Sequence, residues 1–130
     1  MQTSRLFIAT AVIEAATGLA LLIAPGLVVG ILVGAAADAP GGMVVARVAA
    51  LAMLSISIAC WVARGDGQSG ASRGLVLALL FYNSAVALLL VHASVGLHLS
   101  AIGLWPAAVL HAAFVAWCVV ALRAPAASRR

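Results

Sequence analysis

The sequence predicts an all-α fold: an antiparallel four-helix bundle, integral to a membrane, that occupies all 130 residues as a single domain. Two observations support this fold class. Hydrophobic residues make up 66% of the chain and charged residues only 8%, whereas a soluble domain is nearer ~45–50% apolar and ~25% charged. The apolar residues also gather into four stretches, each near the ~20 residues that cross a bilayer as one helix.

The first stretch, residues 6–24, follows Arg5 and ends at Pro25-Gly26. A cleaved signal peptide is the alternative, because Arg5 gives a positive start and AAAD at 35–38 resembles a cleavage site. However, Glu14 interrupts the apolar run, and the run exceeds the ~7–15 residues of a signal core. We therefore expect a retained transmembrane helix.

Residues 26–34, GLVVGILVG, are too short to span a bilayer. They either prolong the first helix past a kink at Pro25 or lie at the membrane interface as a short amphipathic turn. Residues 35–42, AAADAPGG, are typical of a loop.

The remaining three helices are expected at residues 43–63, 74–95 and 104–122. Residues 64–72, RGDGQSGAS, form the most polar stretch and predict a short exposed loop between the first two of them. Residues 96–103, GLHLSAIG, turn the chain before the last helix, in which Pro106 takes a tolerated first-turn position.

Arginine placement predicts that both termini lie in the cytoplasm. Loops rich in Arg stay on the cytoplasmic side, and six arginines would lie there: Arg5, Arg64, Arg73, Arg123, Arg129 and Arg130. The two opposite loops carry Asp38 and His98 and no Arg. Trp61 and Trp105 fall near opposite membrane boundaries, as interfacial aromatics do. The basic residues are spread along the chain, so we expect no nucleic-acid partner.

The two cysteines, Cys60 and Cys118, match no metal-binding or redox spacing. Both fall toward the cytoplasmic end, where thiols stay reduced. We expect no disulfide and two small apolar packing residues.

Two charged residues, Glu14 and Arg47, lie inside the predicted spans. A charge in hydrocarbon costs at least ~2.5–3.5 kcal/mol, so it usually faces the bundle and has a partner. Helical rise places Arg47 roughly 9 Å nearer the outer face than Glu14, a gap that its long stem can partly close. An ion pair between them is one hypothesis, and a buried Glu14 that exchanges a proton is a second. In a third, Arg47 points outward alone while Glu14 bonds to Asn83 or a hydroxyl.

Neighbouring small and polar residues support a helix contact at Glu14. Thr10, Thr17 and Gly18 share its helix face, a stripe suited to close helix packing. Asn83 falls at a similar depth in the third helix, so a hydrogen bond to Glu14 is plausible.

The histidines raise the question of a cofactor. His92 and His111 lie toward the same face of the membrane, and paired imidazoles can ligate haem b. The other hypothesis is a histidine that faces the bundle and bonds to backbone or to groups near Arg47. Asn83 and His92 are nine residues apart, so they point to opposite faces of one helix. An outward-facing Asn83 or His92 would favour self-association or membership of a larger membrane complex.

Several short segments carry a family resemblance: TGLALLIAP, MVVARVAALAML ending in CWVAR, FYN, and LWPAAVLH. They resemble segments of small DoxX-like four-helix bacterial inner-membrane proteins. This resemblance covers most of the chain and implies a four-helix, multi-pass bundle in a bacterial inner (plasma) membrane. The length, the helix count and Glu14 in the first helix also resemble small multidrug-resistance transporters, which implies proton-coupled transport. This sequence departs from that family in two ways. A Val-x-Gly-Thr pattern follows the Glu in the family, whereas Ala15, Ala16, Thr17 and Gly18 follow it here. The family's aromatic cluster is also thin here, because Tyr82 is the only tyrosine.

We find no nucleophile–base pair, phosphate loop or acidic metal cluster, so we expect no enzymatic activity. The main hypothesis is an accessory or scaffold subunit in the lipid bilayer, either self-associating or part of a larger complex, with no cofactor. In it the Glu14–Arg47 pair and Asn83 are structural. One alternative is a proton-coupled small-molecule carrier that uses Glu14. The other is a haem-b electron-transfer protein with His92 and His111 as ligands.

Overall fold

A computed structural model describes residues 2–34, 39–66 and 69–123, and this part of the chain contains helices and no strands. The long helices are α1 (Gln2–Ile23), α3 (Pro40–Ala63), α4 (Gly70–Val95) and α5 (Leu104–Arg123). A short helix, α2 (Pro25–Val33), follows α1. All four long helices are long and apolar enough to span a membrane, as the sequence predicts. Three of them, α1, α3 and α4, begin about one turn before the expected starts.

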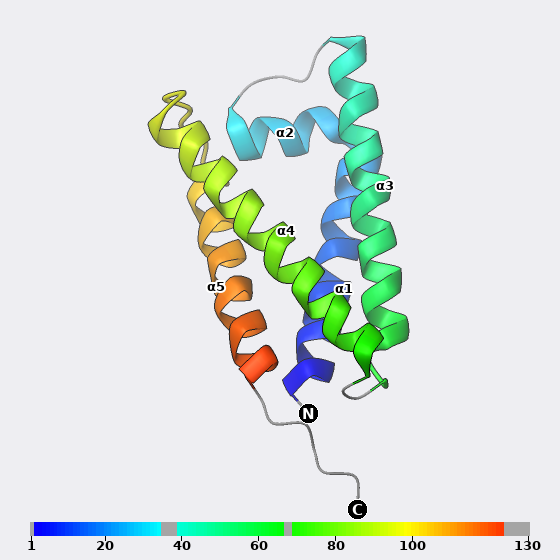
Figure 1. Cartoon of the computed structure of the whole chain (residues 1–130). Helices are drawn as coiled ribbons and strands as arrows, with labels where there is room; N and C mark the ends of the chain where they lie inside the picture. The colour runs from blue at the N-terminus through cyan, green and yellow to red at the C-terminus, as the bar shows by residue number, and fades with distance from the viewer. Residues whose placement is uncertain (1, 35–38, 67–68, 124–130) are drawn as a thin grey trace, which may run out of the picture.

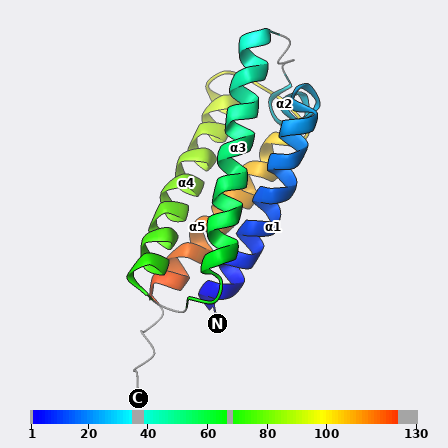
Figure 2. The same cartoon turned by 90° about the vertical axis from the view of Figure 1, so that its right-hand side faces the viewer.

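The long helices form two closely packed pairs, α1 with α3 and α4 with α5. In Figure 1 the α1–α3 pair lies on the right, and α4 crosses the view diagonally toward the upper left. The start of α1, the ends of α3 and α5, and the start of α4 all lie at the lower end of the molecule (Figure 1). In the view of Figure 2 the long helices run in roughly the same direction, and α2 lies beside the upper end of α1.

Proline ends α1 and begins α2. Because Pro25 has no N–H and its ring clashes with the preceding turn, α1 stops at Ile23, and Ala24 takes a non-helical conformation. Helix α2 then runs across the space between the two pairs at the upper end (Figure 1) and packs on α1, α3 and α5. The segment expected at residues 26–34 is therefore a separate short helix that follows a break at Ala24. A position at the membrane interface stays a prediction.

A backbone hydrogen bond joins α2 to the connection between α4 and α5. The Gly103 N–H donates to the Ile31 carbonyl over 2.9 Å. A Cβ atom on Gly103 would lie 2.8 Å from that carbonyl oxygen, so only glycine permits this approach. The contact joins α2 to the connection that leads into α5.

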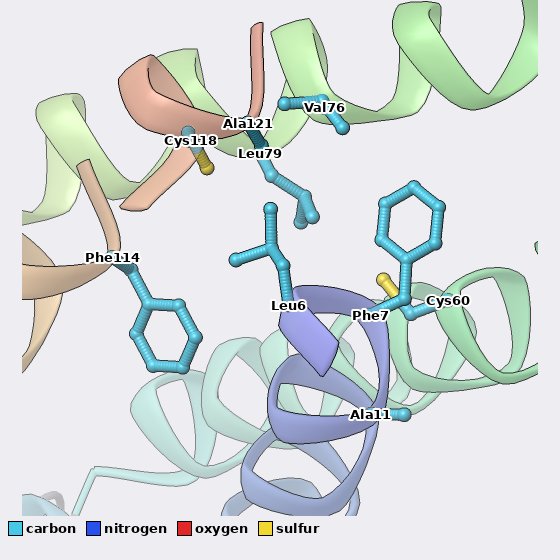
Figure 3. Close-up of a cluster of buried hydrophobic side chains, with 9 residues drawn as sticks. All are labelled: Leu6, Phe7, Ala11, Cys60, Val76, Leu79, Phe114, Cys118 and Ala121. Atoms are coloured by element: carbon cyan, nitrogen blue, oxygen red, sulfur yellow. The ribbon is translucent and has the colours of Figure 1, made fainter. Parts of the chain in front are cut away.

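A core of buried side chains joins all four long helices near the lower end. Figure 3 shows its members, which come from α1, α3, α4 and α5: Leu6, Phe7, Ala11, Cys60, Val76, Leu79, Phe114, Cys118 and Ala121. A second, smaller core at the upper end contains Leu21, Ala46 and Ala50, with Val28 and Val29 of α2 packed against it. The two helix pairs are therefore joined by side chains below and by α2 above.

Helices α1 and α3 approach closely because small residues line their contact. A Cβ atom on Gly18 would lie 3.1 Å from the Ala50 carbonyl oxygen. Near the lower core, the buried Ser57 hydroxyl donates a 2.7 Å hydrogen bond to the Ala11 carbonyl. Close approach through small residues and interhelical hydrogen bonds is how helices associate in lipid, where no hydrophobic force drives them together.

The outer faces of the long helices are apolar and exposed. Examples are Val62, Phe81 and Leu88, each more than two thirds exposed. A surface of this kind is expected where hydrocarbon, not water, surrounds the protein.

Candidate functional site

The strongest candidate site is centred on Glu14 in α1, near the middle of that helix. Its side chain is buried, with 5% of its surface exposed, and its Oε2 atom has no hydrogen-bond partner in the described structure. A buried polar group without a partner costs about 1–3 kcal/mol. Such a group therefore needs an explanation, and a partner that binds there is one.

Thr10 extends this site by one helical turn. Residues four apart share a helix face. Thr10 is likewise buried, and its Oγ1 atom has no hydrogen-bond partner within residues 2–34, 39–66 and 69–123. A threonine in a helix often bonds to the carbonyl one turn earlier, but Thr10 does not. The two unpaired oxygens thus line one buried face of α1.

Tyr82 reaches this face from α4. Its side chain lies close to the Glu14 carboxyl, whose Oε2 atom has no hydrogen-bond partner in the described structure. The Tyr82 ring also meets the His111 ring of α5 edge to face, with centroids 5.8 Å apart. Tyr82 therefore connects Glu14 of one helix pair with His111 of the other.

Asn83 and His111 complete the cluster. The Asn83 side chain is buried and donates from Nδ2 to the Leu79 carbonyl over 2.8 Å. Its Oδ1 lies 2.8 Å from Nδ1 of His111. The structure thus brings polar side chains of α1, α4 and α5 into one region, which we call the polar cluster: Glu14, Tyr82, Asn83 and His111, with Thr10 one helical turn from Glu14.

The expected ion pair between Glu14 and Arg47 is not formed. Arg47 is exposed on α3, and no ion pair joins it to Glu14 in the described structure. Ala46 and Ala50 face α1, and a side chain one residue later is turned by about 100° away from that contact. Of the three hypotheses about these charges, the ion pair disagrees with the geometry. An outward Arg47 with Glu14 beside a hydroxyl, that of Tyr82, agrees with it, and so does a buried Glu14 that exchanges a proton.

The two histidines proposed as haem ligands do not meet. His92 is exposed and its ring lies against Gly96 at the end of α4, whereas His111 faces Asn83. Asn83 is buried and His92 is exposed, as expected for opposite faces of one helix. His98, the other outer histidine, is exposed in the connection to α5 with a left-handed φ of 54°. Within the described ranges, no three of His, Cys, Asp or Glu gather at one place.

The sequence alone indicates Glu14, Asn83 and His111 as candidates, but not Tyr82 and not the unpaired oxygen of Thr10. A usable signal for Tyr82 is its position next to Asn83 on a helix, because adjacent residues cover neighbouring faces. Thr10 is expected from the sequence only as part of a small polar stripe for helix packing. That its Oγ1 atom has no partner is visible only in the structure.

Exposed arginines mark the lower end of the bundle: Arg5, Arg64, Arg73 and Arg123. The Arg64 guanidinium lies 4.1 Å from the centre of the Trp61 ring and donates a hydrogen bond to the Trp61 carbonyl. This pairing is typical of a residue pair at a membrane interface. Trp105 is exposed near the opposite end, at the start of α5.

Comparisons with protein-family models, with curated proteins and with solved structures found no match to this chain. The resemblances to DoxX-like proteins and to small multidrug-resistance transporters therefore stay predictions.

Proposed function

We propose that the chain is a multi-pass protein of a bacterial inner membrane, antiparallel, with both termini in the cytoplasm. Four apolar helices and their exposed outer faces support residence in lipid. The arginines at the end that holds the start of α1 and the end of α5 support the orientation. In this placement the polar cluster lies within the hydrocarbon region.

We further propose that the protein carries a small cationic molecule in exchange for a proton held by Glu14. One observation carries this proposal: among the described residues, buried Glu14 has no ion-pair partner, and its unpaired Oε2 atom lies one helical turn from a second unpaired oxygen, Oγ1 of Thr10. A carboxyl that alternates between a proton and a bound cation requires an interior position without a permanent counter-ion. Pairing with Arg47 would have blocked this exchange.

The architecture supports movement around the site. Glu14 belongs to the α1–α3 pair, whereas Tyr82 and His111 belong to the α4–α5 pair. A site at the boundary of two helix units can open to either side when one unit rocks against the other.

The accessory or scaffold function draws less support from the geometry. That hypothesis gave Glu14 a structural role through an ion pair with Arg47, and the ion pair is absent from the described residues. The haem-b hypothesis needs His92 and His111 at one site, and they point to different surroundings. We propose neither an enzymatic activity nor a resident cofactor.

Proton release in detergent solution tests the carrier function. The purified protein is titrated in weak buffer with tetraphenylphosphonium, a lipophilic cation that brings no proton of its own. Release of a proton on binding is expected from the unaltered protein and should be lost in Glu14→Gln. Asp66→Asn is the matched control. Asp66 is exposed in the connection between α3 and α4, so its loss should not affect proton release.

Equal release by the unaltered protein and Glu14→Gln would overturn the proposal. Binding of tetraphenylphosphonium without proton release from either protein would overturn it as well.

A further inference from the structure

The hydrogen bonds of Asn83 determine which nitrogen of His111 carries a proton. A backbone carbonyl only accepts hydrogen bonds, so the 2.8 Å contact with the Leu79 carbonyl must come from the Nδ2 amide of Asn83. The Asn83 side chain therefore cannot turn over without placing two acceptor oxygens against each other. Its Oδ1 atom is left to face Nδ1 of His111 at 2.8 Å.

Because Oδ1 only accepts, Nδ1 of His111 must be the donor. A neutral imidazole carries one N–H, so the other nitrogen, Nε2, then has an open lone pair. The partner of one ring nitrogen sets the state of the other, as it does for histidines that ligate metals or transfer protons.

We propose that Asn83 is a positioning residue that holds neutral His111 as its Nδ1–H tautomer and leaves Nε2 as the atom through which His111 accepts a hydrogen bond or a proton. The His111 ring touches Tyr82, and Tyr82 in turn neighbours Glu14. His111 is thereby the second proton-accepting group of the polar cluster, on the opposite helix pair from Glu14.

This inference deepens the proposed carrier function. It rests on that function only where Nε2 of His111 accepts a hydrogen bond or a proton during transport. The tautomer itself requires no ligand and no transport. A failure of proton release on cation binding would leave the tautomer unaffected, and a wrong tautomer would leave the Glu14 exchange unaffected, so the two tests fail separately.

Nitrogen NMR of the protein labelled with ¹⁵N-histidine measures the tautomer directly, since protonated and bare ring nitrogens resonate far apart. The spectrum is recorded in lipid nanodiscs in alkaline buffer, where imidazole is neutral, and His111→Gln assigns the signals. We expect the Nδ1–H tautomer of His111 to outnumber the Nε2–H tautomer by roughly tenfold or more. One buried hydrogen bond of ~1.4 kcal/mol provides this preference.

Two variants separate positioning from packing. Asn83→Leu keeps the volume but removes the acceptor, and should bring the two tautomers of His111 to comparable populations. Asn83→Asp keeps an acceptor oxygen and should retain the Nδ1–H form. Ser84→Ala, the next residue along α4, is the matched control and should leave the His111 signals unchanged.

An Nε2–H form or an even mixture in the unaltered protein would overturn the inference without any variant having to fold. It would also be overturned if Asn83→Leu kept the Nδ1–H form as fully as the unaltered protein.

Discussion

The Ser57 hydroxyl of α3 donates a 2.7 Å hydrogen bond to the Ala11 carbonyl of α1, within the buried contact of these two helices. The bond ties α3 to the helix that carries Glu14, one turn below it. The position of Glu14 therefore depends on how firmly α1 and α3 are packed.

Ser57→Ala should destabilise the bundle, because it removes this interhelical bond. Hydrogen bonds between helices in membranes are worth about 0.6–1.7 kcal/mol, and we expect a loss in that range on unfolding in mixed micelles. Ser55→Ala is the control, since Ser55 is exposed and its hydroxyl donates to the Leu51 carbonyl of its own helix. Equal effects of the two variants would show that the Ser57 bond contributes nothing between the helices.

Gly18→Ala should also weaken the α1–α3 contact. The added Cβ would lie 3.1 Å from the Ala50 carbonyl oxygen and 3.1 Å from Leu54 Cγ, and overpacking of this kind costs about 1–3 kcal/mol. Gly30→Ala is the comparison, because a Cβ there meets nothing within 4 Å. The same unfolding assay should show a loss for the first variant and no loss for the second; a neutral Gly18→Ala would mean that the helices pack less closely than described.

Glu14 and Arg47 should be energetically independent. In a double-mutant cycle with Glu14→Gln and Arg47→Gln, the free energies of unfolding should add within about 0.3–0.5 kcal/mol, as they do for residues that share no contact. A coupling energy well above that range would restore the ion pair that the sequence suggested and would argue against a Glu14 free to exchange a proton.

Gly103→Ala should release α2 from the connection between α4 and α5. The new Cβ would lie 2.8 Å from the Ile31 carbonyl oxygen, so the Gly103–Ile31 hydrogen bond cannot persist. Amide hydrogen exchange in α2 should become faster by roughly tenfold, the equivalent of one lost hydrogen bond of ~1.4 kcal/mol. Gly74→Ala in α4, where a Cβ meets nothing within 4 Å, should leave α2 exchange unchanged. Unchanged exchange in both variants would mean that α2 is held by its other contacts.

Hydropathy was sufficient to locate the four long helices, because each apolar stretch approaches the length that hydrocarbon requires. The rotation of successive residues about a helix axis was sufficient to predict that Asn83 and His92 lie on opposite faces of one helix. Pro25 predicted a break in the chain but not its direction. Whether α2 continues α1 or crosses the bundle depends on the contact between Ile31 of α2 and Gly103. These two residues lie far apart in the sequence.

The polar cluster was harder to foresee, because it depends on the rotation of each helix about its own axis. Arg47 and Ala46 are neighbours in sequence, yet only Ala46 is buried toward α1. Depth in the membrane, which the sequence does give, made Arg47 a reasonable partner for Glu14. The rotation of each helix about its axis depends on the packing of both helix pairs. This rotation makes Tyr82, not Arg47, the neighbour of Glu14.

The proposed function depends most on the polar cluster lying inside a bilayer crossed by four helices, with the lower end of the bundle in the cytoplasm. Single cysteines introduced as Gln2→Cys, Gly65→Cys and Ser100→Cys test this with a membrane-impermeant maleimide on intact spheroplasts. All three positions are exposed, and the buried Cys60 and Cys118 give the background. We expect labelling at position 100 alone, and at positions 2 and 65 only after the membrane is permeabilised; labelling of all three in intact spheroplasts, or of 2 and 65 without 100, would contradict this placement.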